Sequence, residues 1–485
     1  MPEDRRPVRQ EAPAGAPERG GSLDLAEPRV VHVVGVGGAG MSAIATVLVQ
    51  MGHRVSGSDL KDSTTLERLA LLGVDVHVGH DATNIPADAD AVVISTAILA
   101  TNAEVVEAQA RGVPVHRRAD ALVAIAQTRR TMAVAGSHGK TTTASMLALV
   151  LRADNRHPSF VIGGDLNEVG TNAAYDDGEW LVVEADESDG TFLALEPAAA
   201  LLTNVEADHL DHFGGLVELT ESFHTFARGV GGPLVCCADD PVARQIATEC
   251  SGITYGFSEG ARYRGVDYRG GGNGSRMRVV HTTDAGKAEL GEIELPVPGR
   301  HNALNALGAT ALALEAGVPF PAAAAALAGF GGVARRFQFR GEADGVTIVD
   351  DYAHLPSEVQ AAIATAREGC ADGTWRRVVV VFQPHRYSRT ESLWRDFADA
   401  FTLADALVIT DVYAAGEPPR PGVSGRLILR SVLDAHPGLA VSYLPRRGDV
   451  EAAFARLTRP GDVVLTLGAG DVNTLADTWL TRQAS

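Results

Sequence analysis

One short stretch, residues 137–143, constrains the fold of this chain more than any other. It follows an apolar run, residues 131–136, that is typical of a buried strand, and it precedes residues 144–151, which are rich in helix formers. A strand, a glycine turn bearing Lys140 and a helix together form the architecture of a phosphate-binding loop. The strict pattern has a glycine where this chain has Val134, so the match is partial.

The chemistry of such a loop predicts its ligand. Backbone N–H groups and the positive end of the helix dipole face an anion, the lysine reaches a terminal phosphate, and a hydroxyl binds Mg²⁺. The chain has only three lysines, Lys61, Lys140 and Lys287, so a lysine at this position is informative. We predict a nucleoside triphosphate site; the alternative is an ordinary strand–helix turn with a solvated lysine.

Size and charge exclude several classes of protein. A chain of 485 residues suggests about three domains. The net charge of −19 argues against nucleic-acid binding, and because no apolar run approaches ~20 residues, we expect no membrane insertion. The four cysteines form no CxxC pair, which favours the reducing cytoplasm. Residues 1–28 are predicted to be a disordered tail.

The first folded region contains a second glycine loop. Residues 30–34 form a β-branched run, and glycines follow in a G-x-G-x-x-G pattern at Gly35, Gly37 and Gly40. The next predicted strand ends at Asp59, where an acidic residue commonly binds a ribose hydroxyl. Such a loop can hold NAD or any other diphosphate, including that of a UDP-sugar, and this choice stays open. Further alternation of strands and helices predicts a doubly wound domain.

Beyond the phosphate loop, two predicted strands run into polar clusters. Residues 180–189 form a strand that ends in four carboxylates, which favours Mg²⁺ held by oxygen ligands over a solvated turn. A second strand leads to His209, beside Glu206 and Asp208, and zinc is not expected because no tight His/Cys set is present.

The following segment contains a predicted β-meander and a predicted helix. Residues 260–294 alternate in polarity around a glycine cluster, which predicts the meander. An Ala-rich helix then carries Asn302 and Asn305 on one face, where they either meet a ligand or are solvated amides.

The last third of the chain repeats one pattern. Predicted strands at 346–349, 378–382 and 462–467 each run into polar residues, at the strand ends where open α/β sheets bind ligands. Arg386 and Arg389 follow the second of these strands and could hold a carboxylate, unless they are solvated.

Taken in order, these motifs resemble the Mur ligase family over about residues 29–475. The motifs are GVGGAGMS (35–42), SHGKTTT (137–143), EADESD (184–189), TNVEADH (203–209), HNALN (301–305), RRF (335–337), DDYAHLP (350–356) and QPHRYSR (383–389). The resemblance implies an α/β protein of three domains: a Rossmann-like UDP-sugar-binding domain (29–127), a central P-loop ATPase-like α/β domain (128–328) and a C-terminal Rossmann-like amino-acid-binding domain (329–485). It also implies a monomer or homodimer.

The resemblance further implies a reaction of cytoplasmic peptidoglycan precursor synthesis. ATP would phosphorylate the lactyl carboxylate of UDP-N-acetylmuramate, with Mg²⁺ as cofactor. The amine of L-alanine would then attack the acyl phosphate, and a tetrahedral intermediate would collapse to an amide and phosphate.

Site residues carried over from the family fall into five overlapping sets. Thr141 and Glu184 would hold one Mg²⁺ and His209 the other. The ATP set is Ser137, His138, Gly139, Lys140, Thr141, Thr142, His301, Asn302, Asn305, Arg336 and Asp351. The catalytic residues would be Lys140, Glu184, His209, Arg336 and Asp351. The UDP-sugar set is Gly37, Gly38, Ala39, Gly40, Asp59, His80, Ser95 and Thr96, and the amino-acid set is Tyr352, His354, Arg386 and Arg389.

Three departures from the family pattern stand out. The loop has Ser137 where the family usually has threonine. Leu355 replaces the second histidine of a D-Y-G/A-H-H-P motif, which affects the amino-acid pocket and catalytic efficiency and not the reaction class. No lysine lies between Lys140 and Lys287, so the carbamylated lysine of several relatives is not expected.

Other functions would explain parts of the sequence. A recycling ligase would add a whole tripeptide to the same nucleotide, and a folylpolyglutamate-type ligase is disfavoured by the first glycine loop. An NAD-dependent dehydrogenase would explain residues 35–59 but would leave Lys140, Glu184 and His209 without a role. A catalytically inactive regulator would be expected to have lost these residues.

Overall fold

The computed structural model describes residues 23–187, 190–206 and 213–482. By internal contacts the chain divides into two compact units. Unit 1 contains the described residues up to Thr131 together with 157–163 and 172–183, and unit 2 contains 132–156, 164–171 and the described residues from Glu184 onward. No helix in the described ranges combines the length and apolar content needed to cross a bilayer.

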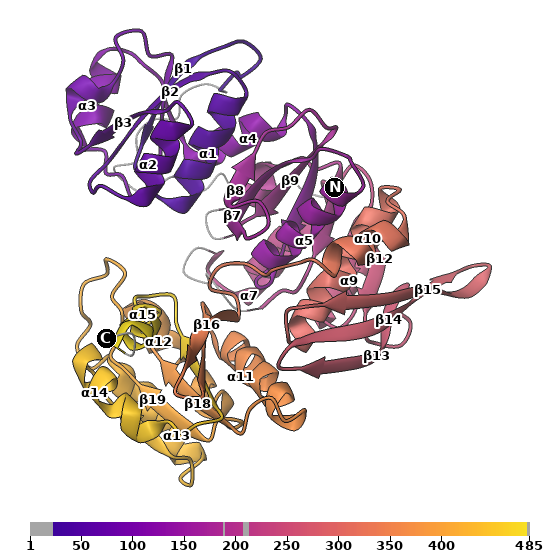
Figure 1. Ribbon diagram of the computed structural model, residues 1–485. Coiled ribbons are helices and arrows are strands. Elements are labelled where there is room, and N and C mark those ends of the chain that lie inside the picture. The colour runs from indigo at the N-terminus through magenta and orange to yellow at the C-terminus, as the bar shows by residue number, and fades with distance from the viewer. Residues whose placement is uncertain (1–22, 188–189, 207–212, 483–485) are drawn as a thin grey trace, which may run out of the picture. The chain divides into compact units, whose positions relative to one another are not determined.

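The main sheet of unit 1 has five parallel strands in the order β3-β2-β1-β4-β5. Its strands are β1 (Val30–Val34), β2 (Arg54–Asp59), β3 (Asp75–Val78), β4 (Ala91–Ile94) and β5 (Val115–Arg117). Helices α1 (Ala39–Gln50), α2 (Thr64–Leu71) and α4 (Arg118–Ala126) lie on one face, and α3 (Ala103–Ala110) lies on the other with the short helix η1 (Ala82–Asn84) (Figure 1). β1 and β4 are buried because helices cover both faces, which confirms the predicted doubly wound fold.

The N-terminal boundary differs from the prediction. Residues 1–28 were expected to form a disordered tail, yet Leu23 and Leu25 are buried, with relative exposures of 9% and 7%. The predicted tail is therefore too long at its C-terminal end. The physical reason is the Leu-Asp-Leu alternation at residues 23–25, which lets both leucines pack inward. Unit 1 also contains most of β7 (Ser159–Leu166) and β9 (Trp180–Ala185), which pair in parallel, and β8 (Thr171–Ala174).

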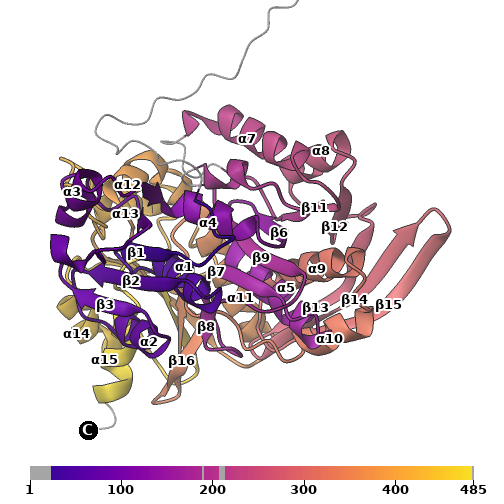
Figure 2. The same cartoon turned by 90° about the horizontal axis from the view of Figure 1, so that it is seen from above.

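The first half of unit 2 is built on strand β6 (Arg130–Ala135), most of which belongs to this unit. The strands that follow one another from β6 are β10 (Ala199–Leu202), β11 (Leu234–Cys237), β12 (Ile253–Gly256), β13 (Tyr263–Gly271), β14 (Gly274–Thr283) and β15 (Gly286–Leu295). Strands β6, β10, β11, β12 and β13 run parallel to one another. Strands β13 to β15 form the predicted antiparallel meander, which projects as a long ribbon (Figures 1 and 2).

Helices position the phosphate loop within this part of unit 2. The buried helix α5 (Lys140–Ala153) packs along α9 (Arg300–Glu315). The remaining helices are η2 (Thr191–Ala194), α7 (Leu216–Arg228), α8 (Pro241–Glu249) and α10 (Phe320–Leu327). Helix α9 begins at Arg300, and its residue Asn305 lies beside Gly139 at the start of α5.

The second half of unit 2 has a six-stranded sheet in the order β16-β17-β21-β18-β19-β20, in which only the β16–β17 pair is antiparallel. The strands are β16 (Gln338–Ala343), β17 (Val346–Asp351), β18 (Arg377–Phe382), β19 (Ala406–Ile409), β20 (Val441–Tyr443) and β21 (Asp462–Leu467). The helices are α11 (Pro356–Ala371), α12 (Tyr387–Leu393), η3 (Asp396–Asp399), α13 (Gly425–Ala435), α14 (Arg447–Leu457) and α15 (Thr474–Arg482). Alternate residues of β18 enter two different hydrophobic clusters, so each face of this sheet has its own core.

The burial of Leu25 can be tested directly. Leu25→Ala should lower the free energy of unfolding by about 2 kcal/mol, because it removes a buried side chain and leaves a cavity. Urea denaturation would measure the change. Leu71→Ala is the control, since Leu71 is 90% exposed and its loss should change stability by less than about 0.5 kcal/mol. Equal effects of the two substitutions would contradict the burial of this segment.

Candidate functional site

Helix α5 begins at a glycine that the local geometry requires. Gly139 caps the helix with φ of +78°, a left-handed conformation that residues with side chains adopt at a cost. A Cβ at this position would lie 2.7 Å from Oδ1 of Asn305. No side chain caps α5, so its first N–H groups are available to an anion.

Residues that follow β10 hold the phosphate loop in place. The Thr203 hydroxyl donates to the carbonyl of His138 over 2.6 Å, and the Asn204 side chain accepts from the His138 N–H over 2.8 Å. The backbone N–H of Glu206 donates to the Ser137 hydroxyl over 2.9 Å. These contacts fix the loop on both sides of His138.

Lys140 is held by acceptors in its immediate surroundings. Its Nζ lies 2.7 Å from Oε2 of Glu187, 2.7 Å from the carbonyl of Gly136 and 3.3 Å from that of Ser137. Burial alone would lower the pKa of Lys140, but the carboxylates led by Glu187 outweigh it and raise the pKa. Glu187, which is 1% exposed, was predicted only as one of four carboxylates after a strand.

Two of the predicted metal ligands lie together. The Thr141 hydroxyl donates to both carboxylate oxygens of Glu184 over 3.0 Å. Such a group of oxygen donors suits Mg²⁺, a hard cation. The third predicted ligand, His209, lies outside the described residues, as does Asp208.

A cavity of about 190 Å³ opens beside the phosphate loop in unit 2. Most of the predicted ATP set lines it: His138, Gly139, Thr141, Thr142, His301, Asn302, Asn305, Arg336 and Asp351. The lining also includes polar residues that were not predicted as site residues, namely Asn204, Glu206, Ser357 and Glu358. The structure thus brings residues of α5, α9 and the C-terminal segment to one pocket.

Burial and neighbouring charges set the protonation states of several pocket residues. Burial lowers the pKa of His301 to about 4, with the charge of Arg336 acting in the same direction, so His301 is neutral at pH 7. Burial raises the pKa of Asp351 to about 6, against the charge of Arg336. Burial alone would also lower the pKa of His138, but hydrogen bonds to Glu206 and Glu358 raise it to about 10. His138 is therefore an imidazolium at neutral pH.

The predicted amino-acid set gathers around an additional histidine. The His354 ring lies edge-on to both Tyr352 and His385, at centroid distances of 5.5 and 5.7 Å. Arg389 Nη1 lies 3.0 Å from His385 Nδ1. Burial lowers the pKa of His385 to about 3, with nearby cations acting in the same direction. Arg386 caps α12 with φ of +66°, and its N–H donates to the carbonyl of Tyr413. His385 lies within a motif that the sequence highlighted, but it was not predicted as a site residue.

In unit 1, Asp59 shapes the first glycine loop. The Gly37 N–H donates to Oδ2 of Asp59 over 2.9 Å, and a Cβ on Gly37 would lie 2.9 Å from the same oxygen. Helix α1 begins at Ala39 and has no side-chain cap at Gly38, which leaves its N-terminus suited to a diphosphate. Asp59 thus orders the loop in addition to its predicted role with a ribose.

A buried carboxylate, Glu104, contacts the predicted UDP-sugar residue His80. Glu104 is fully buried and accepts hydrogen bonds from Ser58 and Asn84, both over 2.7 Å, and its Oε2 lies 3.0 Å from His80 Nδ1. Burial opposes ionisation, but the nearby His32 ring, 3.6 Å away, and the hydrogen bonds from Asn84 and Ser58 prevail and lower the pKa of Glu104 to about 2. The other predicted residues, Ser95 and Thr96, directly follow β4.

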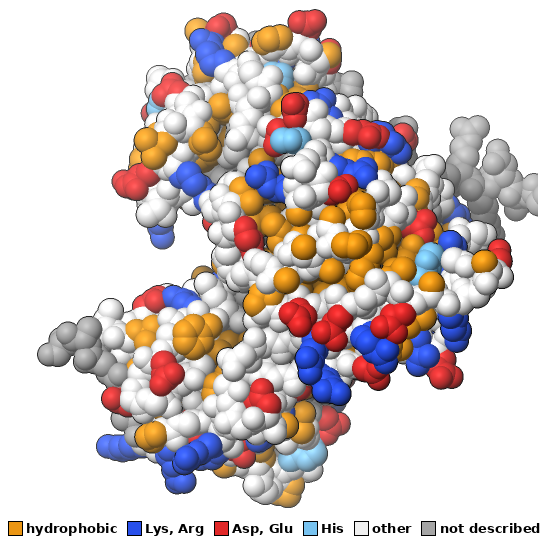
Figure 3. Space-filling model, turned by 45° about the vertical axis from the view of Figure 1, so that its right-hand side comes forward, with side chains coloured by type: hydrophobic (Ala, Val, Ile, Leu, Met, Phe, Trp, Pro, Cys, Tyr) orange, Lys and Arg blue, Asp and Glu red, His pale blue; other side chains and the backbone are white. Residues whose placement is uncertain are grey.

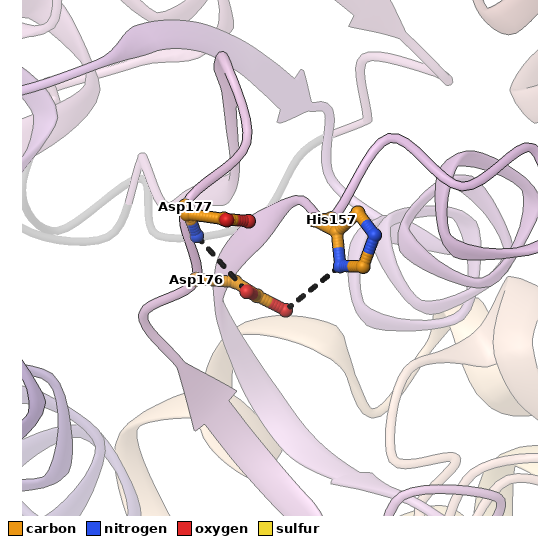
Figure 4. A group of neighbouring side chains, drawn as sticks. All are labelled: His157, Asp176 and Asp177. Atoms are coloured by element: carbon orange, nitrogen blue, oxygen red, sulfur yellow. Dashed lines mark hydrogen bonds and ion pairs between the residues drawn. The ribbon is translucent and has the colours of Figure 1, made fainter.

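One group of described side chains in unit 1 has the spacing of a metal site. The ligand atoms of His157, Asp176 and Asp177 lie within 4.8 Å of one another. Figure 4 shows the Asp176 carboxylate between the His157 ring, 3.8 Å away, and the Asp177 N–H, which donates to it over 2.9 Å. His157 and Asp177 are exposed. A surface ion pair and a turn account for these contacts, and we assign no metal here.

On the face drawn in Figure 3, acidic and basic side chains are interspersed.

Three family models match successive parts of the chain. The model described as the Mur ligase family catalytic domain matches residues 30–130, the Mur ligase middle domain matches 134–313, and the Mur ligase glutamate ligase domain matches 335–470. The chain therefore belongs to the Mur ligase family.

Individual relatives are similar over nearly the whole chain. The UDP-N-acetylmuramate–L-alanine ligase of Solidesulfovibrio magneticus is 46% identical over 448 residues, which is 92% of this chain and 96% of that protein. The protein of the same name from Rubrobacter xylanophilus is 46% identical over 460 residues, covering 93% and 99%. The crystal structure of a UDP-N-acetylmuramate-alanine ligase from Thermotoga maritima is 28% identical, with a TM-score of 0.77 and coverage of 94% of this chain and 99% of that one.

The buried carboxylate of unit 1 gives a pH-dependent prediction. Because the pKa of Glu104 is lowered from 4.5 to about 2, its ionised form stabilises the fold above pH 4.5, and this contribution is lost as the pH falls through about 2. Glu104→Gln should lower the free energy of unfolding by about 3 kcal/mol at pH 7 and by progressively less below pH 4.5. Denaturant titrations at several pH values would measure the loss, with Glu107→Gln on the same helix as control. A loss that does not change with pH would contradict the assignment.

Proposed function

We propose that the chain is an ATP-dependent ligase that joins L-alanine to the lactyl carboxylate of UDP-N-acetylmuramate. Its membership of the Mur ligase family and the names of its 46%-identical relatives support this function. One structural observation carries the proposal. The phosphate loop, the Thr141–Glu184 pair, Arg336 and Asp351 belong to one compact unit, and most of these residues line the same pocket.

ATP is proposed to bind in this pocket. The start of α5 and Lys140 would take the phosphates, and Lys140 would exchange Glu187 for a phosphate oxygen. His301, Asn302 and Asn305 would meet the adenine and phosphate side, Arg336 the γ-phosphate and Asp351 the ribose region. Thr141 and Glu184 would hold one Mg²⁺ and His209 the other, and Mg²⁺ would neutralise charge on the phosphates.

The reaction proceeds in two steps. An oxygen of the lactyl carboxylate attacks the γ-phosphorus of ATP, which breaks the bond to the bridging oxygen and releases ADP. The amine of L-alanine then attacks the carbonyl carbon of the acyl phosphate, loses a proton, and expels inorganic phosphate as the amide forms. Lys140 and Arg336 stabilise the negative charge that is transferred in the first step.

The other two substrates are assigned to different parts of the chain. The loop at residues 37–40 would hold the UDP diphosphate, with Asp59, His80, Ser95 and Thr96 beside it. Tyr352, His354, Arg386 and Arg389 would face the amino acid, with the two arginines on its carboxylate.

We further propose domain boundaries at 127/128 and 328/329, a monomer or homodimer, and a cytoplasmic location. All four cysteines are free thiols, as a reducing compartment would leave them. An NAD-dependent dehydrogenase would leave the phosphate loop and its pocket without a role.

The proposed division of labour between the two units can be tested at Lys140. The wild-type protein should convert ATP, UDP-N-acetylmuramate and L-alanine to ADP, phosphate and UDP-N-acetylmuramoyl-L-alanine, as detected by mass spectrometry. Lys140→Ala should lower turnover by at least about 10³-fold, because charge stabilisation in the phosphoryl transfer is lost. Binding of UDP-N-acetylmuramate, measured by calorimetry without ATP, should persist. Equal loss of both would contradict the proposal.

The amino-acid site is tested at Arg386. Arg386→Ala should raise the KM for L-alanine by about tenfold or more, because a charged hydrogen bond to the carboxylate is lost. The KM for ATP should change by less than about twofold. Arg395→Ala is the control, since this arginine stacks on Trp394 in the same segment. An unchanged KM for L-alanine in the Arg386 variant would refute this role.

A further inference from the structure

The two carboxylate oxygens of Glu358 have different partners. Glu358 is in the first turn of α11, and its Oε2 accepts from the backbone N–H groups of His354 (2.9 Å) and Leu355 (3.2 Å). These bonds form the N-terminal cap of α11. The other oxygen, Oε1, lies 3.2 Å from Nδ1 of His138 in the phosphate loop. Capping alone explains only Oε2.

His138 lies between two carboxylates that come from distant parts of the sequence. Its Nδ1 faces Glu358, and its Nε2 lies 3.3 Å from Oε2 of Glu206. The hydroxyl of Ser357 donates to the same oxygen of Glu206 over 2.6 Å. With a carboxylate at each nitrogen, the ring is a doubly donating imidazolium. The first turn of α11 is thus joined to the phosphate loop by one direct ion pair and one bond through Glu206.

The ion pair between His138 and Glu358 is largely shielded from solvent. The side chains of His138 and Glu358 are each only 14% exposed, so water screens their attraction less than at the surface. Both line the pocket together with Arg336 and Asp351. Asp351 ends strand β17, and only a short segment separates it from α11, so a shift of α11 relative to the phosphate loop would move Asp351 as well.

We propose that Glu358 is a positioning residue for ATP, which holds α11 against His138 so that Arg336 and Asp351 meet a nucleotide bound on the phosphate loop. The proposal rests on the proposed function in taking ATP as the ligand of the pocket. It adds a role for a residue that does not touch the reacting atoms and acts through His138.

Glutamine separates this role from helix capping. Glu358→Gln keeps a side-chain oxygen for the cap, since glutamine also serves in capping boxes. It removes the negative charge that faces His138 and that also lies 3.2 Å from Nδ1 of His354. This variant should keep a melting temperature close to that of the wild type while the KM for ATP rises by about tenfold and kcat falls. Glu358→Ala should in addition lower the melting temperature.

A control variant is available on the same helix. Glu368 lies near the end of α11 and accepts a hydrogen bond from the Tyr268 hydroxyl over 2.7 Å. Glu368→Gln removes a charged contact of α11 without touching the phosphate loop, and it should leave both the KM for ATP and kcat within about twofold. A similar rise in KM in this control would overturn the specific role of Glu358, as would unchanged kinetics in Glu358→Gln.

Two further measurements keep the test decisive. His138→Asn removes the imidazolium partner of Glu358 and leaves the α11 cap intact, so it should raise the KM for ATP. In the double variant, Glu358→Gln should add less than its full effect, because the ion pair is already lost. Full additivity, or an unchanged KM in His138→Asn, would overturn the proposal.

If the wild type forms no product, the proposed reaction fails. The role of Glu358 is then tested by the Kd of a fluorescent ATP analogue, which should rise about tenfold in Glu358→Gln and not in Glu368→Gln.

Discussion

The backbone conformation of the phosphate loop is the constraint on which the rest of the site depends. Gly139 takes a left-handed conformation that starts α5 without a side-chain cap, and Asn305 leaves no room for a larger residue there. The side chains of Thr203 and Asn204 hydrogen-bond to the backbone C=O and N–H of His138 in the loop. Because these bonds order the loop, its N–H groups, Lys140 and Thr141 are arranged in advance for an anion and a cation.

Charge pairing explains how so acidic a protein can hold a polyphosphate. The chain carries a net charge of −19, so cations must be concentrated locally where anionic substrates bind. Lys140 is paired with Glu187, and His138 with Glu206 and Glu358, which lessens the cost of burying each cation. The exchange of Glu187 for a phosphate oxygen at Lys140 is part of the proposed mechanism. The ion pairs of His138 with Glu206 and Glu358 also join segments of unit 2 that are far apart in sequence.

Local sequence patterns predicted much of the fold and less of the site. β-Branched runs gave the positions of β1, β17, β18 and β21, because strands buried on both faces must be apolar throughout. Helices α7 and α8 were not predicted, although the residues that α7 buries, Leu219, Phe223 and Phe226, have helical spacing. Glu358 and Glu206 were not predicted as site residues, because their importance comes from proximity to His138, which only tertiary structure creates. A glutamate three residues after Leu355 reads locally as a helix cap and no more.

The central claim is that one pocket activates a carboxylate through an acyl phosphate. Transfer of ¹⁸O from the lactyl carboxylate of UDP-N-acetylmuramate tests it most directly. When the labelled nucleotide is incubated with ATP, Mg²⁺ and L-alanine, mass spectrometry of the released phosphate should find one ¹⁸O per phosphate, because the attacking oxygen leaves with phosphorus when the amide forms. Amide formation with unlabelled phosphate would contradict the acyl phosphate, and phosphate release without amide formation would contradict the ligase itself.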